Sequence, residues 1–290
     1  MPEHNLNNLI NYAANKRGVI IVIDGGDGSG KALQTLLLMN ELNKLKDISS
    51  IPLEIGTLDF PQYGKNVFAD MTGRYLRGEF GDAATISPYF IIPYFALDRF
   101  CEKDTLLQFK NKGNIGVLNR YTTSNLGHQA AKIEDNSEAL KCISLIEQME
   151  YDTLGLPRPD LVFYLDVPRE IGRLLVMIKK ERIYTRGSIL DGHESSAKYQ
   201  EKAASVFRAL CEERAPGRTK VEGWVKIECN RHAGENYFKQ AKKLENLLLS
   251  DFSKNTKTMV RDEISRDFLL TPEEIHEKID SETEKHFSQL

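Results

Sequence analysis

A short segment near the start of the chain constrains the fold more than any other part. The apolar residues 19–23 run directly into the sequence Asp-Gly-Gly-Asp-Gly-Ser-Gly-Lys at residues 24–31, and a helical pattern follows. A buried strand, a glycine-rich turn and a helix in this order are typical of a loop that wraps around phosphate groups. The segment therefore predicts an α/β fold with an anion-binding loop at the end of a buried strand.

The loop fits the phosphate-binding pattern of Gly, four residues, Gly-Lys and then Ser or Thr at every position except the last. Its glycines let backbone N–H groups converge on an anion, the following helix adds its positive end, and Lys31 supplies a mobile charge. A plain glycine turn is the competing interpretation. We expect the loop to bind a nucleoside triphosphate through Gly25, Gly26, Asp27, Gly28, Ser29, Gly30, Lys31, Ala32 and Leu33.

Ala32 stands where the pattern requires a hydroxyl, which usually ligates Mg²⁺. Magnesium keeps several waters in most sites, so a water can replace that hydroxyl. We therefore expect Mg²⁺ to be held by the nucleotide and by waters, with no direct protein ligand. A dinucleotide-binding fingerprint fits less well, because Lys31 then stands where its last glycine belongs.

Short apolar runs alternate with helical patterns along most of the chain. The expected strands are residues 19–23, 53–59, 115–119, 161–166 and 225–229. The expected helices are residues 33–45, 65–76, 88–109, 137–153, 168–180 and 197–211. This alternation predicts the three-layer α/β fold of P-loop NTPases, with a five-stranded parallel sheet covered by helices on both faces. Ligands of such sheets bind at the carboxyl ends of the strands, where the motifs fall.

The chain changes character after residue 231, so we expect one domain over residues 1–231 and a helical extension over residues 232–290 that packs on or beside it. Thr271, Pro272 and Glu274 form a strong helix start, with a cap, a first-turn proline and a capping-box partner. Residues 251–267 are charged and lack a clear pattern, and we expect a mobile surface insertion there.

Composition excludes several classes of protein. The net charge of −3 over 290 residues argues against a dedicated nucleic-acid binder. No apolar run approaches the length of a membrane span, and the polar N-terminus lacks the apolar core of a signal peptide. The widely spaced cysteines 101, 142, 211 and 229 indicate reduced packing residues, so we expect a cytoplasmic protein.

Three further motifs fall at or near strand ends. Phe60-Pro61 follows the second expected strand, and Asn119-Arg120-Tyr121-Thr122-Thr123-Ser124 follows the third. Phe95 and Arg99 lie one turn apart in a helix, so the ring can present a face while the arginine holds an anion. Arginine is suited to a bidentate grip on phosphate, which makes Arg99 and Arg120 a candidate second anion site.

Together with the loop, these motifs resemble the thymidylate kinase family of P-loop nucleoside monophosphate kinases. The resemblance runs from about residue 19 to residue 229 and includes the helix start at Thr271. It implies ATP-dependent phosphorylation of dTMP to dTDP, Mg²⁺ bound with ATP, and a homodimer; from the charge and the apolar runs we expect neither nucleic acid nor membrane as a partner. The residues that it assigns to dTMP binding are Asp27, Phe60, Pro61, Phe95, Arg99, Arg120, Ser124, Asn125, His128 and Gln129.

The resemblance also implies individual roles. Asp27 approaches the sugar 3′-hydroxyl, Phe95 stacks on thymine, and Arg99 and Arg120 hold the acceptor phosphate. Lys31, Arg99 and Arg120 form the catalytic set, joined by Arg182 or Arg186 from a basic lid at about residues 179–196. The lid is chosen because Gly28 occupies the loop position where other members carry an extra basic residue. No general base is required, because phosphoryl transfer depends on positioning and dispersed positive charge.

Several residues depart from the family pattern. Ala32 and Leu33 replace the usual hydroxyl pair, Asn119 replaces an aspartate, and Tyr63 stands near a frequent arginine. Two alternatives therefore stay open. A kinase of another nucleoside monophosphate would keep the same motifs, because stacking on Phe95 does not select a base. A nucleotide-binding pseudokinase would explain Ala32 and Asn119.

Overall fold

The structure is a computed structural model that describes residues 6–15, 17–49, 51–179, 197–212, 223–231 and 237–290. Its sheet contains β1 (Val19–Gly25), β2 (Ile55–Asp59), β3 (Ile115–Asn119), β4 (Leu161–Asp166) and β5 (Gly223–Glu228). The strands are parallel and lie in the order β2-β3-β1-β4-β5. The expected α/β fold with a five-stranded parallel sheet is confirmed.

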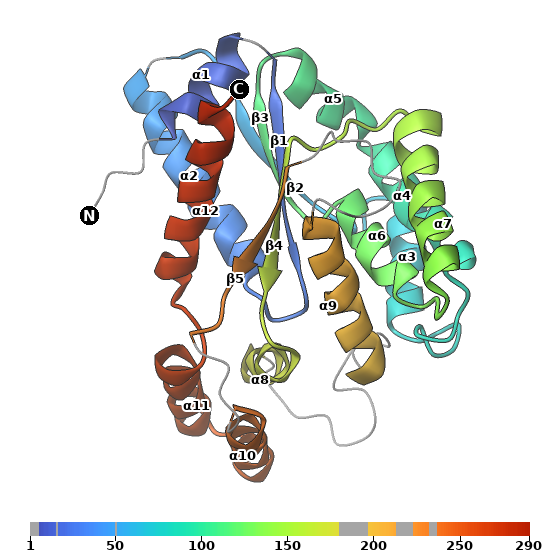
Figure 1. Ribbon diagram of the computed structural model, residues 1–290, viewed down its shortest axis with the longest axis vertical. Helices are drawn as coiled ribbons and strands as arrows, with labels where there is room; N and C mark the ends of the chain where they lie inside the picture. The colour runs from blue at the N-terminus through green and yellow to red at the C-terminus, as the bar shows by residue number, and fades with distance from the viewer. Residues whose placement is uncertain (1–5, 16, 50, 180–196, 213–222, 232–236) are drawn as a thin grey trace.

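Helices cover both faces of the sheet (Figure 1). One face carries α1 (Asn7–Asn15), α2 (Lys31–Ser49) and α12 (Pro272–Ser288). The other side holds α3 (Val67–Leu76), α4 (Pro88–Cys101), α5 (Lys103–Asn111), α6 (Thr122–Ala130), α7 (Asn136–Glu147), a π-helical turn (Gln148–Thr153) and α9 (Ala197–Cys211). Near the carboxyl edge lie α8 (Arg169–Lys179), α10 (Tyr237–Ser250) and α11 (Lys254–Asp267).

The central strand β1 is buried from both faces of the sheet. Every residue of Val19–Gly25 is buried, and β1 pairs with β3 on one side and β4 on the other. Ile21 and Ile23 enter the core on the α2 side, while Ile20 and Val22 enter the core on the opposite face. Burial of one such side chain stabilises a fold by about 1.5–3 kcal/mol. The phosphate loop therefore begins at the end of a strand that is buried throughout and paired on both sides.

The expectation of a mobile insertion over residues 251–267 is wrong, because α11 occupies most of this stretch. The Ser253 side chain caps the helix by accepting a hydrogen bond from the Thr256 backbone N–H. Thr256, Val260 and Ile264 are buried at a spacing of four residues, and α11 packs on α10 and α8. Charged residues between these positions hid a narrow apolar stripe.

Three helices can also be compared with the expectations from the sequence. The helix expected over residues 88–109 is divided into α4 and α5 at Glu102, and α1 was not expected. The capping box of α12 is confirmed, with Thr271 and Glu274 bonded to each other's backbone N–H groups.

The domain boundary at residue 231 stays a prediction. Side chains of α12, among them Ile275 and Ile279, belong to the same apolar core as β1 and α2. Among the described residues, no helix combines the length and the apolar character that crossing a bilayer requires.

Candidate active site

The turn between β1 and α2 has the backbone of a phosphate loop. Gly28 and Gly30 have φ angles of +77° and +88°, a region that glycine adopts readily. At Gly26 and Gly30 an added Cβ would lie more than 4 Å from other atoms of the described residues, so this side of the loop is open to a ligand. The N-terminus of α2 begins at Lys31 and directs its positive end into the same space.

Gly28 faces the opposite way and packs against α8. A Cβ at this position would lie only 2.2 Å from the carbonyl oxygen of Gly172. No larger side chain fits here without moving α8, so position 28 cannot present an additional basic residue. Arg182 and Arg186, for which the lid role was expected, lie outside the described residues.

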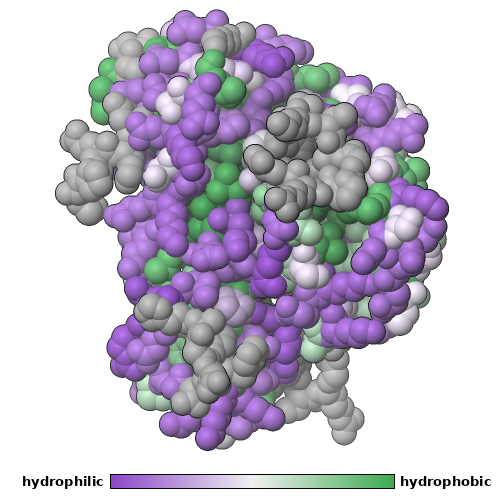
Figure 2. All heavy atoms as spheres, in the orientation of Figure 1, coloured by the Kyte–Doolittle hydropathy of each residue, from purple (hydrophilic) through white to green (hydrophobic). Residues whose placement is uncertain are grey.

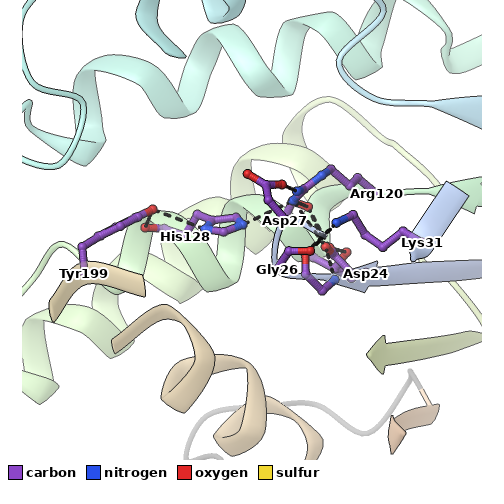
Figure 3. A network of polar contacts seen from close by, with 10 residues as sticks. Asp24, Gly26, Asp27, Lys31, Arg120, His128 and Tyr199 are labelled. Carbon is purple, nitrogen blue, oxygen red and sulfur yellow. Dashed lines mark hydrogen bonds and ion pairs between the residues drawn. The ribbon is translucent and has the colours of Figure 1, made fainter. Parts of the chain in front are cut away.

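The ammonium group of Lys31 lies inside the loop (Figure 3). It donates hydrogen bonds to the backbone carbonyls of Gly25 at 3.0 Å and Gly26 at 2.7 Å. Carbonyls are weaker partners than phosphate oxygens for an ammonium group. Lys31 is therefore already in position to exchange these bonds for an anion held by the loop.

Arg120 connects the phosphate loop with α6. Its Nη2 donates to Asp27 Oδ1 at 2.6 Å, and its Nη1 lies 3.3 Å from both Ser124 Oγ and His128 Nε2. Burial lowers the pKa of Arg120, but Asp27 and Asp24 outweigh burial and raise it, so the guanidinium stays charged. The cation stands between the loop and the predicted acceptor residues.

The backbone of Arg120 is strained. Its φ is +65°, and it is the non-glycine residue with a positive φ in the described part of the chain. Such a conformation costs on the order of 1–3 kcal/mol and is found mostly at functional positions. It directs the chain from the end of β3, where the Arg120 N–H donates to the Ile23 carbonyl at 3.1 Å, back toward the loop.

Asp24, at the end of β1, organises the region and was not identified from the sequence. It is fully buried and accepts hydrogen bonds from the Gly25 N–H, Thr123 Oγ1 and Ser124 Oγ at 2.8, 2.6 and 2.7 Å. The Ser124 hydroxyl is thus engaged with a carboxylate in this structure. A charged residue at the end of an uninterrupted apolar strand was the signal that could have revealed Asp24.

Arg99 is held by a second buried carboxylate, Glu150 of the π-helical turn. Arg99 is 1% exposed, and its Nε and Nη2 each donate to Glu150 at 2.6 Å. Glu150 also accepts bonds from Thr122 Oγ1 at 2.7 Å and Asn125 Nδ2 at 3.1 Å. Sequence reasoning missed Glu150, because no local motif at residues 148–153 indicates a buried charge.

The residues expected to bind dTMP converge on one cavity of about 210 Å³. It is lined by Asp27, Phe60, Pro61, Phe95, Arg99, Arg120, Ser124, Asn125, His128 and Gln129. Tyr63, Leu76 and Tyr121 also line it and were not assigned to it from the sequence. The wall is aromatic and apolar with a few charged groups, the composition of a site for a small organic ligand.

His128 lies between this cavity and a second one of about 230 Å³ bounded by the loop, α8 and α9. Its Nδ1 lies 3.3 Å from the hydroxyl of Tyr199, another residue that the sequence analysis missed (Figure 3). Burial, with a contribution from the Arg120 charge, lowers the pKa of His128 to about 4. The imidazole is therefore neutral at physiological pH.

The oxygen atoms near the loop fit a hard cation surrounded by waters. Within the described residues, Ser29 Oγ and Asn119 Oδ1 are buried and have no hydrogen-bond partner. Asp24 is fully engaged by protein donors, as described above. Magnesium prefers oxygen ligands and retains waters, so a hydroxyl and an amide oxygen without partners in the described part of the chain suit the chemistry of its water shell.

Comparison with known proteins identifies relatives of this chain. A family model described as "Thymidylate kinase" matches residues 23–222. A thymidylate kinase of Mycobacterium tuberculosis (strain CDC 1551 / Oshkosh) is 31% identical over 205 residues, covering 71% of this chain and 91% of that protein. A thymidylate kinase of Caenorhabditis elegans is 28% identical over 200 residues, covering 67% and 79%. A solved thymidylate kinase structure from Candida albicans is 20% identical, with a TM-score of 0.49 and coverage of 83% and 94%.

Proposed function

The chain belongs to the thymidylate kinase family, and we propose that it transfers the γ-phosphoryl group of ATP to dTMP through the loop and cavity described above. The products are ADP and dTDP. The observation that carries the proposal is the convergence of the expected acceptor residues on one cavity, with Arg120 joining that cavity to the phosphate loop.

The donor half of the site is the loop. Its backbone N–H groups and the start of α2 hold the phosphates of ATP, and Lys31 moves its bonds from the Gly25 and Gly26 carbonyls to the β- and γ-phosphates. Mg²⁺ bound together with ATP would neutralise part of the charge on these phosphates. Ser29 and Asn119 would offer oxygen acceptors to its waters, and Arg182 or Arg186 would add positive charge from the expected lid.

The acceptor half is the 210 Å³ cavity. Phe95 stacks on the base, Asp27 approaches the sugar, and Arg120 holds the acceptor phosphate. Because Arg120 is already bonded to Asp27, phosphate binding exchanges one anionic partner for another without desolvating a new cation.

Arg99 has a more restricted role in this mechanism. Its Nε and Nη2 are committed to Glu150, so Nη1 is the nitrogen that remains outside that pair. Glu150 uses two of the five N–H donors of this guanidinium, so the donors left on Nη1 and Nη2 can reach dTMP only in the direction that the pair sets. Glu150 fixes that direction through Thr122 and Asn125.

No side chain has to remove a proton in this reaction, because the acceptor oxygen belongs to a phosphate that is already ionised. Catalysis rests on in-line positioning and on the charges of Lys31 and Arg120. The low pKa of His128 agrees with a neutral spacer between Arg120 and Tyr199 rather than a proton carrier.

The test is an ADP-release assay with dTMP, dUMP, dCMP and AMP as acceptors, with and without Mg²⁺. We expect turnover that requires dTMP and Mg²⁺ together. Arg120→Ala should lower kcat by about 10³-fold, because an arginine at a transferring phosphoryl group contributes on this scale. Arg266→Ala, which removes an exposed arginine on α11, should leave kcat unchanged. Preference for another acceptor, or nucleotide binding without turnover, would refute the proposal.

We also propose a cytoplasmic homodimer. The cysteines at positions 101, 142, 211 and 229 are free thiols, in accord with a reducing compartment. Tyr89, Phe90 and Phe100 expose aromatic surface on α4, and aromatic residues are enriched in protein interfaces.

A further inference from the structure

A cluster of three potential ligands lies between α2 and α12, which run side by side on one face of the sheet (Figure 1). Glu41 comes from α2, and His276 and Asp280 lie one turn apart on α12. His276 Nε2 is 3.2 Å from Glu41 Oε2 and 3.5 Å from Asp280 Oδ2. One ligand atom from each residue can be chosen so that all three lie within 4.8 Å of one another.

These separations match the edges of a small coordination polyhedron. Zinc binds imidazole nitrogen and carboxylate oxygen at about 2.0–2.2 Å, so ligand atoms of a tetrahedral site lie roughly 3.3–3.5 Å apart. The two measured separations, 3.2 and 3.5 Å, bracket this distance. A cation can therefore enter the cluster with small side-chain movements.

Asp280 has an incomplete set of partners. It is 4% exposed, and among the described residues its Oδ1 has no hydrogen-bond partner; the same is true of the buried Nδ1 of His276. Asp280 also lies beside the carboxyl groups of Glu41 and Glu277. Without a cation, a buried carboxyl beside a second one must retain a proton to be accommodated.

We propose that Glu41, His276 and Asp280 bind one divalent transition-metal ion of the zinc class that fastens α12 to α2. Two carboxylates balance the charge of the ion, and the imidazole nitrogen favours zinc over calcium or magnesium. The Glu41 side chain is 33% exposed, which leaves an approach for the ion and a position for a water ligand. Ten residues of helix, about 15 Å along its axis, separate Glu41 from Lys31, so the site is structural rather than catalytic.

The same interface carries a second link. Gln34 Nε2, one helical turn beyond the phosphate loop, donates to the Pro272 carbonyl at 2.8 Å, just where α12 begins. The proposed ion would extend this connection by two turns along α2 and by one to two turns along α12. Metal binding therefore stabilises the packing of the last helix on the helix that follows the loop.

The experiment titrates zinc into metal-stripped full-length protein by calorimetry and follows the melting temperature by circular dichroism. We expect one equivalent to bind and the melting temperature to rise by about 5 °C at a zinc concentration 100 times Kd. The isosteric double variant Glu41→Gln/Asp280→Asn should lose this rise and weaken binding at least tenfold, while Glu277→Gln, beside the cluster, should keep both.

The double variant retains all four cysteines and His276, so zinc captured elsewhere would register equally in variant and wild type. Equal binding by the two proteins, or no zinc-dependent rise in the wild-type melting temperature, would overturn the proposal and identify the cluster as a proton-sharing carboxyl pair. His276→Gln provides an independent check if the double variant is poorly folded. None of these readouts depends on kinase activity.

Discussion

The two halves of the active site are built in different ways. The donor loop is formed by the backbone of contiguous residues 25–31, and Lys31 is held by carbonyls five and six residues away. The acceptor side is held by side-chain ion pairs between distant segments: Arg99 with Glu150, 51 residues apart, and Arg120 with Asp27, 93 residues apart. A locally encoded loop thus faces a cavity that exists only after the whole domain has folded.

This difference indicates which interactions hold each half of the site in its conformation. The acceptor charges are neutralised by protein partners before a substrate arrives, so their geometry is coupled to the stability of the fold. The donor loop relies instead on backbone groups, such as the carbonyls that hold Lys31. Its Ser29 Oγ has no partner among the described residues, as is also true of Asn125 Oδ1 and Gln129 Oε1 in the acceptor wall. Substitutions should therefore change stability on the acceptor side and ligand affinity on the donor side.

The largest change in the free energy of unfolding is expected when Glu150 is substituted. Glu150→Gln leaves the guanidinium of Arg99 buried without its counter-charge, and loss of one partner of a buried pair costs about 3–5 kcal/mol. Urea unfolding measures this loss. Glu138→Gln, in an exposed pair with Lys141, should change the free energy of unfolding by less than about 0.5 kcal/mol. A loss below about 1 kcal/mol for Glu150→Gln would mean that the acceptor wall does not depend on this pair.

The second-largest change in the free energy of unfolding is expected when the pH is lowered. His128 has a pKa of about 4 in the folded protein and an ordinary value of 6.5, so the unfolded chain binds its proton first as the pH falls. Stability is fully retained above about pH 6.5 and declines between pH 6.5 and 4, by roughly 2 kcal/mol at pH 5. His128→Gln should remove this part of the decline, measured as the difference between unfolding free energies at pH 7.5 and 5. If the unfolding free energies of the wild type and of His128→Gln fell by the same amount between pH 7.5 and 5, His128 would not be a buried neutral imidazole.

The smallest effect on stability is expected on the donor side. Ser29→Ala removes an oxygen that bonds to no described residue, so the unfolding free energy should change by less than about 0.5 kcal/mol. The KM for ATP should rise by about fivefold, the equivalent of one net hydrogen bond of about 1 kcal/mol. A variant that loses stability but keeps its KM would reverse the contrast between the two halves.

The same contrast explains what could be predicted from the sequence. The loop is contiguous, and the parallel strands are marked by apolar runs, so their positions are largely as expected; β3 and β4 match residue for residue. The motif residues Phe95, Arg99 and Arg120 were identified because their spacing is local.

Glu150, Asp24 and Tyr199 were missed because their importance comes from partners far away in the sequence. Glu150 binds Arg99 from a π-helical turn, and Tyr199 reaches His128 across 71 residues. The helix α11 was missed for a different reason. Its buried stripe is only one residue wide per turn, and its charged residues dominate the mean hydropathy of the segment.

The packing of α12 on α2 also has a consequence for how the protein is made. Gln34 and its partner Pro272 are 238 residues apart, and synthesis at about 5–20 residues per second separates their appearance by roughly 12–50 s. During that interval the face of α2 that α12 will cover has no such cover in the nascent chain. The helix that follows the phosphate loop is thus among the first parts of the protein to be synthesised and among the last to be enclosed.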